Sequence, residues 1–283
     1  AAMSGRVVDL AVNENDPFTY YIATATGGVW KTTNNGVTSE PVFENENTHS
    51  VGAIALHQKH TNILWVGTGE RANRQSSSWG DGIYKSHDEG KTWQHMGLKD
   101  SHHIGRIALH PTDTNTVYVA AMGHLWGPNN ERGLYKTTDG GETWERIIYV
   151  NDDTGVVDVA LDPQNPNIVY AATYQRRRTP FGFDGGGPGS GLHKSTDGGK
   201  TFTYIDEPNV HVDHHVIWVD PKMPNHLING NDGGLNMSYD AGKSWNKLNS
   251  IALGQFYAIN VDYEKPYNVY GGLQDNGTWK GPH

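Results

Sequence analysis

The sequence of 283 residues contains no cysteine, which excludes a thiol nucleophile and a disulfide framework. It also lacks any apolar run near the roughly 18 residues that a membrane-spanning helix needs. Basic residues are in the minority, since 22 Lys and Arg stand against 31 Asp and Glu, for a formal net charge of −9. This balance disfavours general nucleic-acid binding. We therefore expect no nucleic-acid partner and no membrane span.

Hydrophobic residues are also scarce, at 35% of the chain, whereas aromatic residues reach 10%. The 35 Gly and 13 Pro residues favour turns. This combination is typical of many short strands separated by tight turns, in which Trp and Tyr supply much of the buried area. The composition therefore favours an all-β fold.

A strand–turn–strand pattern recurs six times along the chain. In each copy a polar residue ends one strand, and an apolar residue eight positions later marks the next. The residues between them are rich in Pro, Asn and Asp, which are turn formers. The six pairs are Asn13/Tyr21, His57/Trp65, His110/Tyr118, Asp162/Tyr170, Asp220/Ile228 and Asp262/Tyr270.

A second motif follows five of these copies and reads Ser/Thr-x-Asp-x-Gly-x-Thr/Ser-Trp/Phe; we call it the Asp box. Its carboxylate can accept hydrogen bonds from turn amides, its Gly suits a positive φ, and its aromatic ring can pack on the sheet. The first copy departs from the pattern, because Asn34 replaces the Asp and Ser39 replaces the aromatic residue. We expect the acids of the other four copies to be structural; they are Asp88, Asp139, Asp197 and Asp240.

Together the two motifs predict units of four antiparallel strands, and such units at intervals of about 40–55 residues are typical of β-propeller blades. The sequence therefore predicts an all-β fold, a single β-propeller over residues 1–283 with five Asp-box blades and a partial sixth. Because Gly277–Lys280 matches Gly28–Lys31, the chain ends within the third strand of the sixth blade, and we expect it to be a fragment of a longer protein. The predicted blades span residues 4–46, 49–98, 102–149, 153–206, 211–249 and 254–283.

Longer segments accompany the Asp boxes, among them MSGRVVDL, GLKDSHHIGRIALHP, GHLWGPNNERGLYKTTDGGETW, YQRRRTPFGFDGGGPGSG, VHVDHH and GGLQDNGTWKGP. With these segments, the chain resembles the Asp-box (bacterial neuraminidase repeat) propellers, secreted bacterial proteins that are similar to the sortilin N-terminal domain and glycosyl-hydrolase-like. The resemblance covers essentially the whole chain. It implies a propeller and a secreted, periplasmic or cell-surface location, but it leaves the activity open, because a fold alone does not fix a function.

In a four-stranded blade, the loop between the second and third strands and the entry to the innermost strand open on the same face. Charged, histidine and aromatic residues are concentrated in these segments, and loops on a rigid scaffold are where binding usually occurs. We predict that they converge on one end of the central channel and bind a ligand. The predicted ligand-binding residues are Glu70, Arg71, Trp79, His102, His103, Arg106, His124, Trp126, Arg176, Arg177, His214 and His215.

A candidate metal site is formed by His211, Asp213 and His215, which alternate in sequence and would share one face of a strand. Imidazole and carboxylate groups suit Zn²⁺ or a similar divalent ion. The competing interpretation is a hydrogen-bonded network that lines a water-filled channel. No feature of the sequence requires a cofactor. A divalent metal ion at this site is the one cofactor that the sequence suggests.

Acidic residues at the same end could include a glycosidase pair, whose carboxyl groups lie roughly 5–10 Å apart across a cleft. Asp232 and Asp213 are the candidate catalytic pair. The analogy is with the xyloglucanase family, whose members are also Asp-box propellers. In the alternative interpretation, each carboxylate pairs with an arginine or caps a turn.

Three functions follow as hypotheses. In the favoured one, an extracytoplasmic propeller binds a glycan or a peptide at the loop-rich end of its channel. In the second, the same end hydrolyses glycosides with two acids. In the third, the propeller is a structural or assembly subunit, and other protein chains complete it or dock on it. Whether the chain is an enzyme stays open at this stage.

Overall fold

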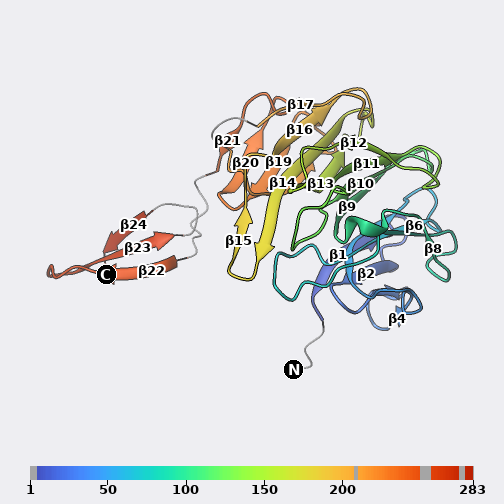
Figure 1. Cartoon of the computed structure of the whole chain (residues 1–283), viewed down its shortest axis with the longest axis horizontal. Helices are drawn as coiled ribbons and strands as arrows, with labels where there is room; N and C mark the ends of the chain where they lie inside the picture. Colours follow the sequence, from blue (N-terminus) through green and yellow to red (C-terminus); the bar gives the residue numbers. More distant parts are fainter. Residues whose placement is uncertain (1–4, 207–209, 249–255, 274–277, 283) are drawn as a thin grey trace.

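The computed structural model describes residues 5–206, 210–248, 256–273 and 278–282. Within these ranges the chain forms six antiparallel sheets, each built from strands that are consecutive in the sequence (Figure 1). The helical content of this part of the chain is one 3₁₀ turn, η1, at Lys99–Ser101. None of the described residues belongs to a helix that is long and apolar enough to cross a membrane.

The strand order within every sheet follows the chain. The first sheet contains β1 (Val7–Val12), β2 (Tyr20–Thr24), β3 (Val29–Thr32) and β4 (Glu40–Pro41). The second contains β5 (Val51–Leu56), β6 (Leu64–Thr68), β7 (Ile83–Ser86) and β8 (Gln94–His95). The third contains β9 (Ile104–Leu109), β10 (Val117–Ala121), β11 (Gly133–Thr137) and β12 (Glu145–Ile148).

The later sheets vary this plan. The fourth contains β13 (Thr154–Leu161), β14 (Val169–Thr179), β16 (Gly191–Ser195) and β17 (Thr203–Tyr204), and β15 (Gly182–Gly185) pairs with the long end of β14. The fifth contains β18 (His214–Val219), β19 (Leu227–Asn231), β20 (Gly234–Ser238) and β21 (Asn246–Lys247). The sixth contains β22 (Phe256–Val261), β23 (Asn268–Leu273) and β24 (Thr278–Pro282).

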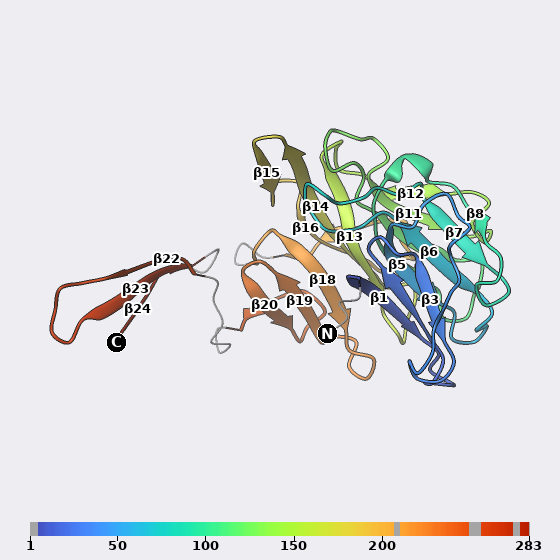
Figure 2. The ribbon, with the colours of Figure 1, turned by 90° about the horizontal axis from the view of Figure 1, so that it is seen from below.

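The first five sheets are arranged side by side in chain order, as propeller blades are. Their innermost strands contact one another in the sequence β1, β5, β9, β13, β18. Figures 1 and 2 show these sheets fanned around a common axis, whereas β22, β23 and β24 lie apart from them. The all-β propeller fold predicted from the sequence is confirmed.

Side chains are most buried in the middle strands of the sheets and most exposed in the outermost strands. Every residue of β6 and β10 is buried, because sheets pack on both of their faces. The outermost strands β8, β17 and β21 are two residues long and exposed. Very short outer strands limit the unpaired backbone that could pair with another chain.

A bulge recurs at the same place in the innermost strands. The pairing register shifts around Val8, Gly52, Gly105, Val157 and His215, each of which is the extra residue of its strand. Such bulges redirect a side chain. A Cβ at position 52 would collide with the carbonyl oxygen of Ile104, and a Cβ at position 105 would collide with the carbonyl oxygen of Val157. The second and third blades therefore need glycine at these bulges.

Each Asp-box acid closes the turn in which it lies. In the second sheet, Asp88 Oδ1 accepts hydrogen bonds from Ser86 Oγ (2.8 Å) and from the Thr92 amide (2.9 Å). The same contacts recur around Asp139, Asp197 and Asp240. The hydroxyl of Thr92 and its amide hold the pKa of Asp88 at about 2.

The aromatic residue of the Asp box joins one sheet to the preceding one. The indole Nε1 donates a hydrogen bond to a backbone carbonyl of that sheet in three blades: Trp93 to Val42 (2.6 Å), Trp144 to Met96 (2.7 Å) and Trp245 to Ile205 (2.6 Å). The fourth blade has Phe202, which lacks a donor. The box is therefore a turn and a clamp between sheets.

We predict that Trp144→Phe destabilises the protein by about 1 kcal/mol, because the Met96 carbonyl loses its donor. The free energy of unfolding, measured in urea, would show the loss. Tyr263→Phe is the control, since this ring is fully exposed. Equal stabilities of the Trp144 variant and the wild type would contradict the clamp.

Candidate functional site

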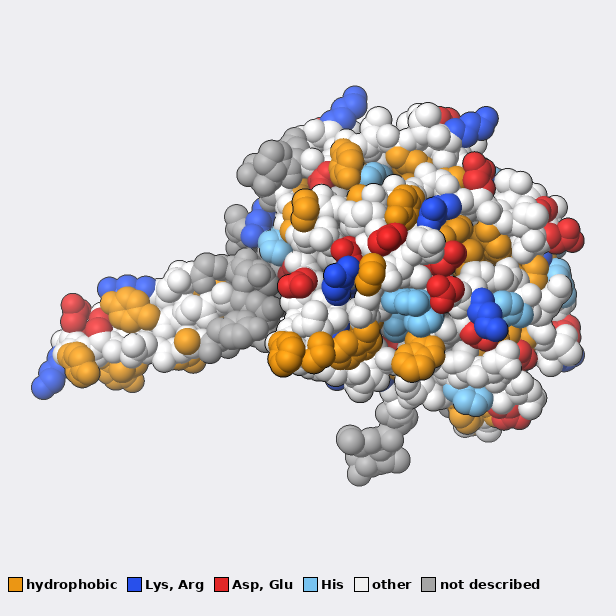
Figure 3. Space-filling view, viewed as in Figure 1, with side chains coloured by type: hydrophobic (Ala, Val, Ile, Leu, Met, Phe, Trp, Pro, Cys, Tyr) orange, Lys and Arg blue, Asp and Glu red, His pale blue; other side chains and the backbone are white. Residues whose placement is uncertain are grey.

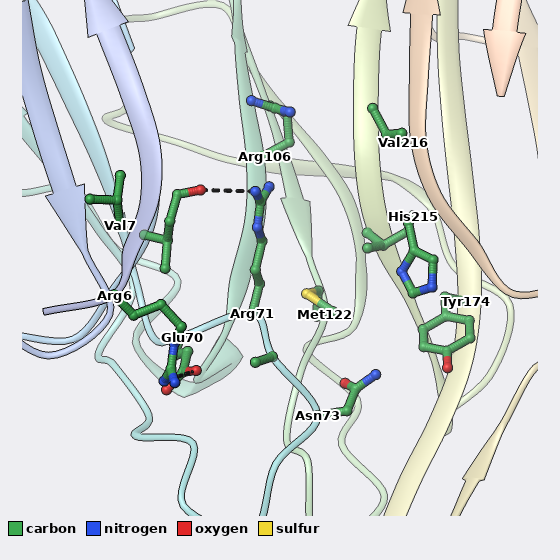
Figure 4. Close-up of a pocket in the computed structure, with 13 residues that line it drawn as sticks. Arg6, Val7, Glu70, Arg71, Asn73, Arg106, Met122, Tyr174, His215 and Val216 are labelled. Atoms are coloured by element: carbon green, nitrogen blue, oxygen red, sulfur yellow. Dashed lines mark hydrogen bonds and ion pairs between the residues drawn. The ribbon is translucent and has the colours of Figure 1, made fainter. Parts of the chain in front are cut away.

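A central cavity of about 550 Å³ lies where the innermost strands converge (Figure 4). Several of its polar groups are predicted ligand-binding residues, namely Glu70, Arg71, Arg106 and His215. The remaining walls are Arg6, Val7, Val8, Ala72, Asn73, Met122, Val157, Tyr174 and Val216. The structure thus brings together residues from all five blades, as the repeat predicted.

Arg106 ties three blades together. Its guanidinium donates to Asp158 Oδ1 (3.0 Å) and lies 3.5 Å from Asp9 Oδ1. The other oxygens of these acids accept from the amides of Ile54 (3.1 Å) and Ile217 (2.8 Å). Most of the hydrogen-bonding capacity of this network is used within the protein.

Glu70 and His103 are held inside the scaffold. Glu70 is 1% exposed and forms an ion pair with Arg6. His103 is 2% exposed, and its Nδ1 donates to the Glu70 carbonyl (2.7 Å). Burial and the Arg176 charge keep the pKa of His103 well below its ordinary range, so this imidazole is neutral at pH 7.

The arginines of the fourth blade differ in accessibility. Arg176 is 1% exposed, donates to Asn73 Oδ1 (2.7 Å), and has its pKa lowered by burial to about 9. Arg177 is partly exposed and pairs with Asp153. It lines a smaller cavity of about 280 Å³, which also contains Asp184 and Phe183. Only the second of these arginines is therefore accessible to a ligand.

An aromatic row is formed by loops of the second and third blades; we define it as Trp79, His102 and His124. The ring centroids of Trp79 and His102 are 6.0 Å apart at an interplanar angle of 22°, and those of His102 and His124 are 3.6 Å apart at 20°. Trp79 is 66% exposed. Figure 3 shows histidine side chains gathered near the middle of this face, beside hydrophobic ones. Trp126, also predicted, is 47% exposed.

An open cavity of about 700 Å³ adjoins the aromatic row. Trp79 and His102 line it together with polar side chains, which are Asn47, Thr48, Asp81, Lys99 and Asp100. The backbone of His102 has a φ of +57°, in the left-handed region that non-glycine residues rarely adopt. This conformation directs the histidine onto the row, and such strain often accompanies functional segments.

The predicted alternation of His211, Asp213 and His215 on one strand face is wrong. β18 begins only at His214, so the first two residues precede the strand, and His215 is its bulge residue. His215 Nε2 instead donates to Asp232 Oδ1 (2.5 Å). His214 is fully buried against Asn229.

Another group has donor atoms close enough for a metal ion: Asp100, His102 and His124. Asp100 Oδ1 lies 3.2 Å from His124 Nε2 and 3.7 Å from His102 Nε2. A bound ion lies near the plane of each ligating imidazole, but the two stacked rings have nearly parallel planes. One ring would have to rotate before both could bind the same ion, so the observed arrangement fits a hydrogen-bonded stack.

The candidate catalytic acids are close in the fold. The Asp232 amide donates to the Asp213 carbonyl (3.3 Å). Both carboxylates act on Tyr174, whose hydroxyl pKa is raised mainly by burial and further by these two charges. Tyr174 and His215 line the central cavity, so the two acids lie beside its wall.

Several functional residues were missed by the sequence analysis. Asp9 and Asp158 hold Arg106, and Arg6 holds Glu70. The Val-Val-Asp shared by β1 and β13 is the signal that could have found the two acids. Asp100 had no such repeat signal, because η1 is unique to its blade among the described residues.

We predict that stability falls as the pH drops below about 6.5, the ordinary pKa of histidine. Burial lowers the folded-state pKa of His103, and that of His193 to about 4, so the unfolded chain binds protons more readily. The stabilisation of the folded protein by each neutral histidine is complete above pH 6.5. As the pH falls toward the pKa of that histidine in the folded state, this stabilisation is lost by about 1.4 kcal/mol per pH unit for each histidine.

Urea unfolding at several pH values would measure this slope. His103→Gln should reduce it, because the amide can still donate to the Glu70 carbonyl without titrating. His49→Gln, at an exposed position, is the control. An unchanged slope in the His103 variant would contradict the assignment.

Curated relatives of the chain are xyloglucanases. One from Paenibacillus sp. is 26% identical over 98% of this chain and 29% of its own length. Xyloglucanase Xgh74A of Acetivibrio thermocellus is 29% identical over 49% of this chain and 18% of its own. The chain therefore spans less than a third of the length of these relatives.

Solved structures show the same fold. An ancestral GH74 enzyme matches with a TM-score of 0.69, at 21% identity over 99% of this chain and 36% of its own. The GH74 enzyme of Niastella koreensis matches with a TM-score of 0.65, at 21% identity over 97% and 44%. At this identity the likeness concerns the fold.

The family model of sortilin and neurotensin receptor 3 (Sortilin-Vps10) matches residues 81–225. This match begins just before β7 and ends just before β19, so it includes the third and fourth blades whole. It agrees with the resemblance drawn from the sequence. Because the match covers slightly more than half of the chain, the protein belongs to the Sortilin-Vps10 family.

Proposed function

We propose that the chain binds a xyloglucan-type glycan on its loop-rich face, as part of a longer glycoside hydrolase-like protein. The observation that carries this proposal is the aromatic row beside the open cavity of about 700 Å³. The xyloglucanase relatives, one of which aligns with 98% of the chain, favour a glycan over a peptide.

The chemistry of the row suits a sugar. A pyranose ring has an apolar C–H face, which can stack on an exposed indole, while its hydroxyls need hydrogen-bonding partners. Trp79 supplies the ring face. Asn47, Asp81 and Lys99 line the same cavity and supply acceptors and donors. Pockets that combine an apolar surface with a few placed polar groups are typical ligand sites.

The proposed ligand also sets the location. Polymeric plant-type glycans are met outside the cytoplasm, so the protein would act as a secreted, periplasmic or cell-surface molecule. The absence of cysteine makes folding there independent of disulfide formation.

We predict that Trp79→Ala weakens binding of xyloglucan oligosaccharides about tenfold, which corresponds to a loss of about 1.4 kcal/mol of stacking energy. Isothermal titration calorimetry would measure the affinity. Phe18→Ala is the matched control: Phe18 is 61% exposed, but its carbonyl accepts from the Asn35 amide at the opposite end of the blade. Equal affinities for all three proteins, or binding of peptides alone, would contradict the proposal.

Hydrolysis of the bound glycan is the second candidate function, and the names of the relatives favour it. Asp213 and Asp232 are the proposed acids. The His215–Asp232 hydrogen bond places an imidazole against one of them, beside the cavity wall. One carboxyl group would protonate the leaving oxygen, and the other would act as the base or nucleophile.

If this chain carries the catalytic pair, Asp232→Asn should lower the rate of reducing-sugar release at least about 100-fold, the usual contribution of a general acid or base. Glu44→Gln, at an exposed acid of the first blade, is the control. Release that is unaffected by substitution of either proposed acid would rule out this pair while leaving glycan binding intact.

A further inference from the structure

Two buried arginines of the third and fourth blades have no carboxylate partner. Arg132 is 0% exposed and Arg176 is 1% exposed. Among the described residues, the arginine ion pairs are instead those of Arg6, Arg106 and Arg177. Burial lowers the pKa of Arg132 to about 10 and that of Arg176 to about 9, so both stay charged at pH 7. Because a buried charge without a counter-ion disfavours folding, these residues must do something that an apolar side chain could not.

Arg132 fixes the backbone of the loop that carries His124. Its Nη1 donates to the Met122 carbonyl (2.8 Å), and its Nη2 donates to the carbonyls of His124 (2.5 Å) and Gly127 (3.2 Å). The same Nη2 reaches the Arg176 carbonyl of β14 (3.2 Å). The loop between β10 and β11 is irregular, so its carbonyls need donors from elsewhere, and one planar guanidinium can serve several of them.

Gly123 belongs to the same arrangement. Its φ is +71°, and a Cβ there would lie 2.2 Å from Arg132 Cγ and 2.7 Å from Asn129 Oδ1. Any other residue at position 123 would displace the arginine side chain. The loop and the guanidinium that it surrounds therefore fit together as one unit.

Arg176 connects this loop with the loop that precedes Trp79. Its Nη1 donates to Asn73 Oδ1 (2.7 Å) in the second blade, and its Nη2 donates to the Gly123 carbonyl (3.3 Å) in the third. Arg178 of the same strand donates to the Asn73 backbone carbonyl (2.8 Å). Asn73 lies at the wall of the central cavity (Figure 4). Loops of two different blades are thus tied to one strand of the fourth blade.

We propose that Arg132 and Arg176 are positioning residues for glycan recognition, a role that rests on the proposed function. Arg132 holds the backbone of His124, whose ring stacks on His102, which stacks in turn on Trp79. Trp79 has little packing of its own, since it is 66% exposed, so the stack fixes the plane of its indole. A platform that is already ordered loses less conformational entropy when a ligand binds.

Arg132→Lys tests this role, because an ammonium group cannot reproduce a planar fork of donors. Binding of xyloglucan oligosaccharides, measured by calorimetry, should weaken about fivefold, since the rings remain but their support is loosened. In the Trp79→Ala protein the same substitution should have no further effect, because it acts through the aromatic row. Arg146→Lys is the matched control: Arg146 also donates to a loop carbonyl of the third blade, that of Asn130, but it is exposed.

The ring stack provides a second readout that needs no glycan. In proton NMR spectra, the Hε1 resonances of His102 and His124 should carry ring-current shifts, because the two rings are 3.6 Å apart, and Arg132→Lys should remove them. Asn73→Ala, at a partly exposed residue, is the milder variant should the lysine variant not fold, and it should reduce the same shifts. Asn73→Asp keeps an acceptor for Arg176 and should restore them.

The outcomes are distinct. A loss of affinity that disappears in the Trp79→Ala background, together with altered histidine shifts, supports the proposal. Histidine shifts that stay unchanged in the Arg132 and Asn73 variants would overturn it, as would a loss of affinity that persists in the Trp79→Ala background. If Trp79→Ala binds the oligosaccharides as tightly as the wild type, the proposed glycan site is wrong, and the histidine shifts alone decide whether the arginines position the stack.

Discussion

The packing of each sheet on its neighbour is the constraint on which the rest of this structure depends. A four-stranded sheet with apolar residues on both faces is unstable alone, and here the innermost strands β5 and β13 are largely buried because a blade covers them on either side. The Asp-box tryptophans make this dependence directional, since Trp144 donates its indole proton to the preceding blade. Buried apolar contacts, such as that of Ile107 with Ala53, continue the same interface to the axis.

This radial packing explains how residues far apart in the sequence form one site. The bulge of each innermost strand lies at the same depth, so Val8, Val157 and His215 reach one cavity from three blades. Arg106 of the third blade connects to the first and fourth blades through Asp9 and Asp158. The buried carboxylate of Asp158 needs this partner, because an unpaired buried ion would cost several kcal/mol. The network therefore orders the axis and also shapes the cavity.

The sequence predicted the architecture well and the roles of individual side chains less well. Turn residues and strand spacing are local signals, so the repeats revealed the blades directly. Burial is not local: Arg176 and Trp79 had equal standing as ligand-binding residues, yet the first is 1% exposed and the second 66%. The alternation of His211, Asp213 and His215 failed because the strand starts at His214, a boundary that no residue pattern marks.

The distribution of charge and aromatic surface also argues for where recognition occurs. The buried acids and arginines near the axis satisfy one another, so their main contribution is to hold the blades in register. Trp79 of the aromatic row lies outside this network and leaves most of its ring in water beside an open cavity. Exposing an indole on a rigid loop forgoes its burial energy, roughly 25 cal/mol for each Å² left in water. A ligand with its own apolar face recovers that energy, and the polar rim then selects a hydroxylated ligand over a plain hydrocarbon surface.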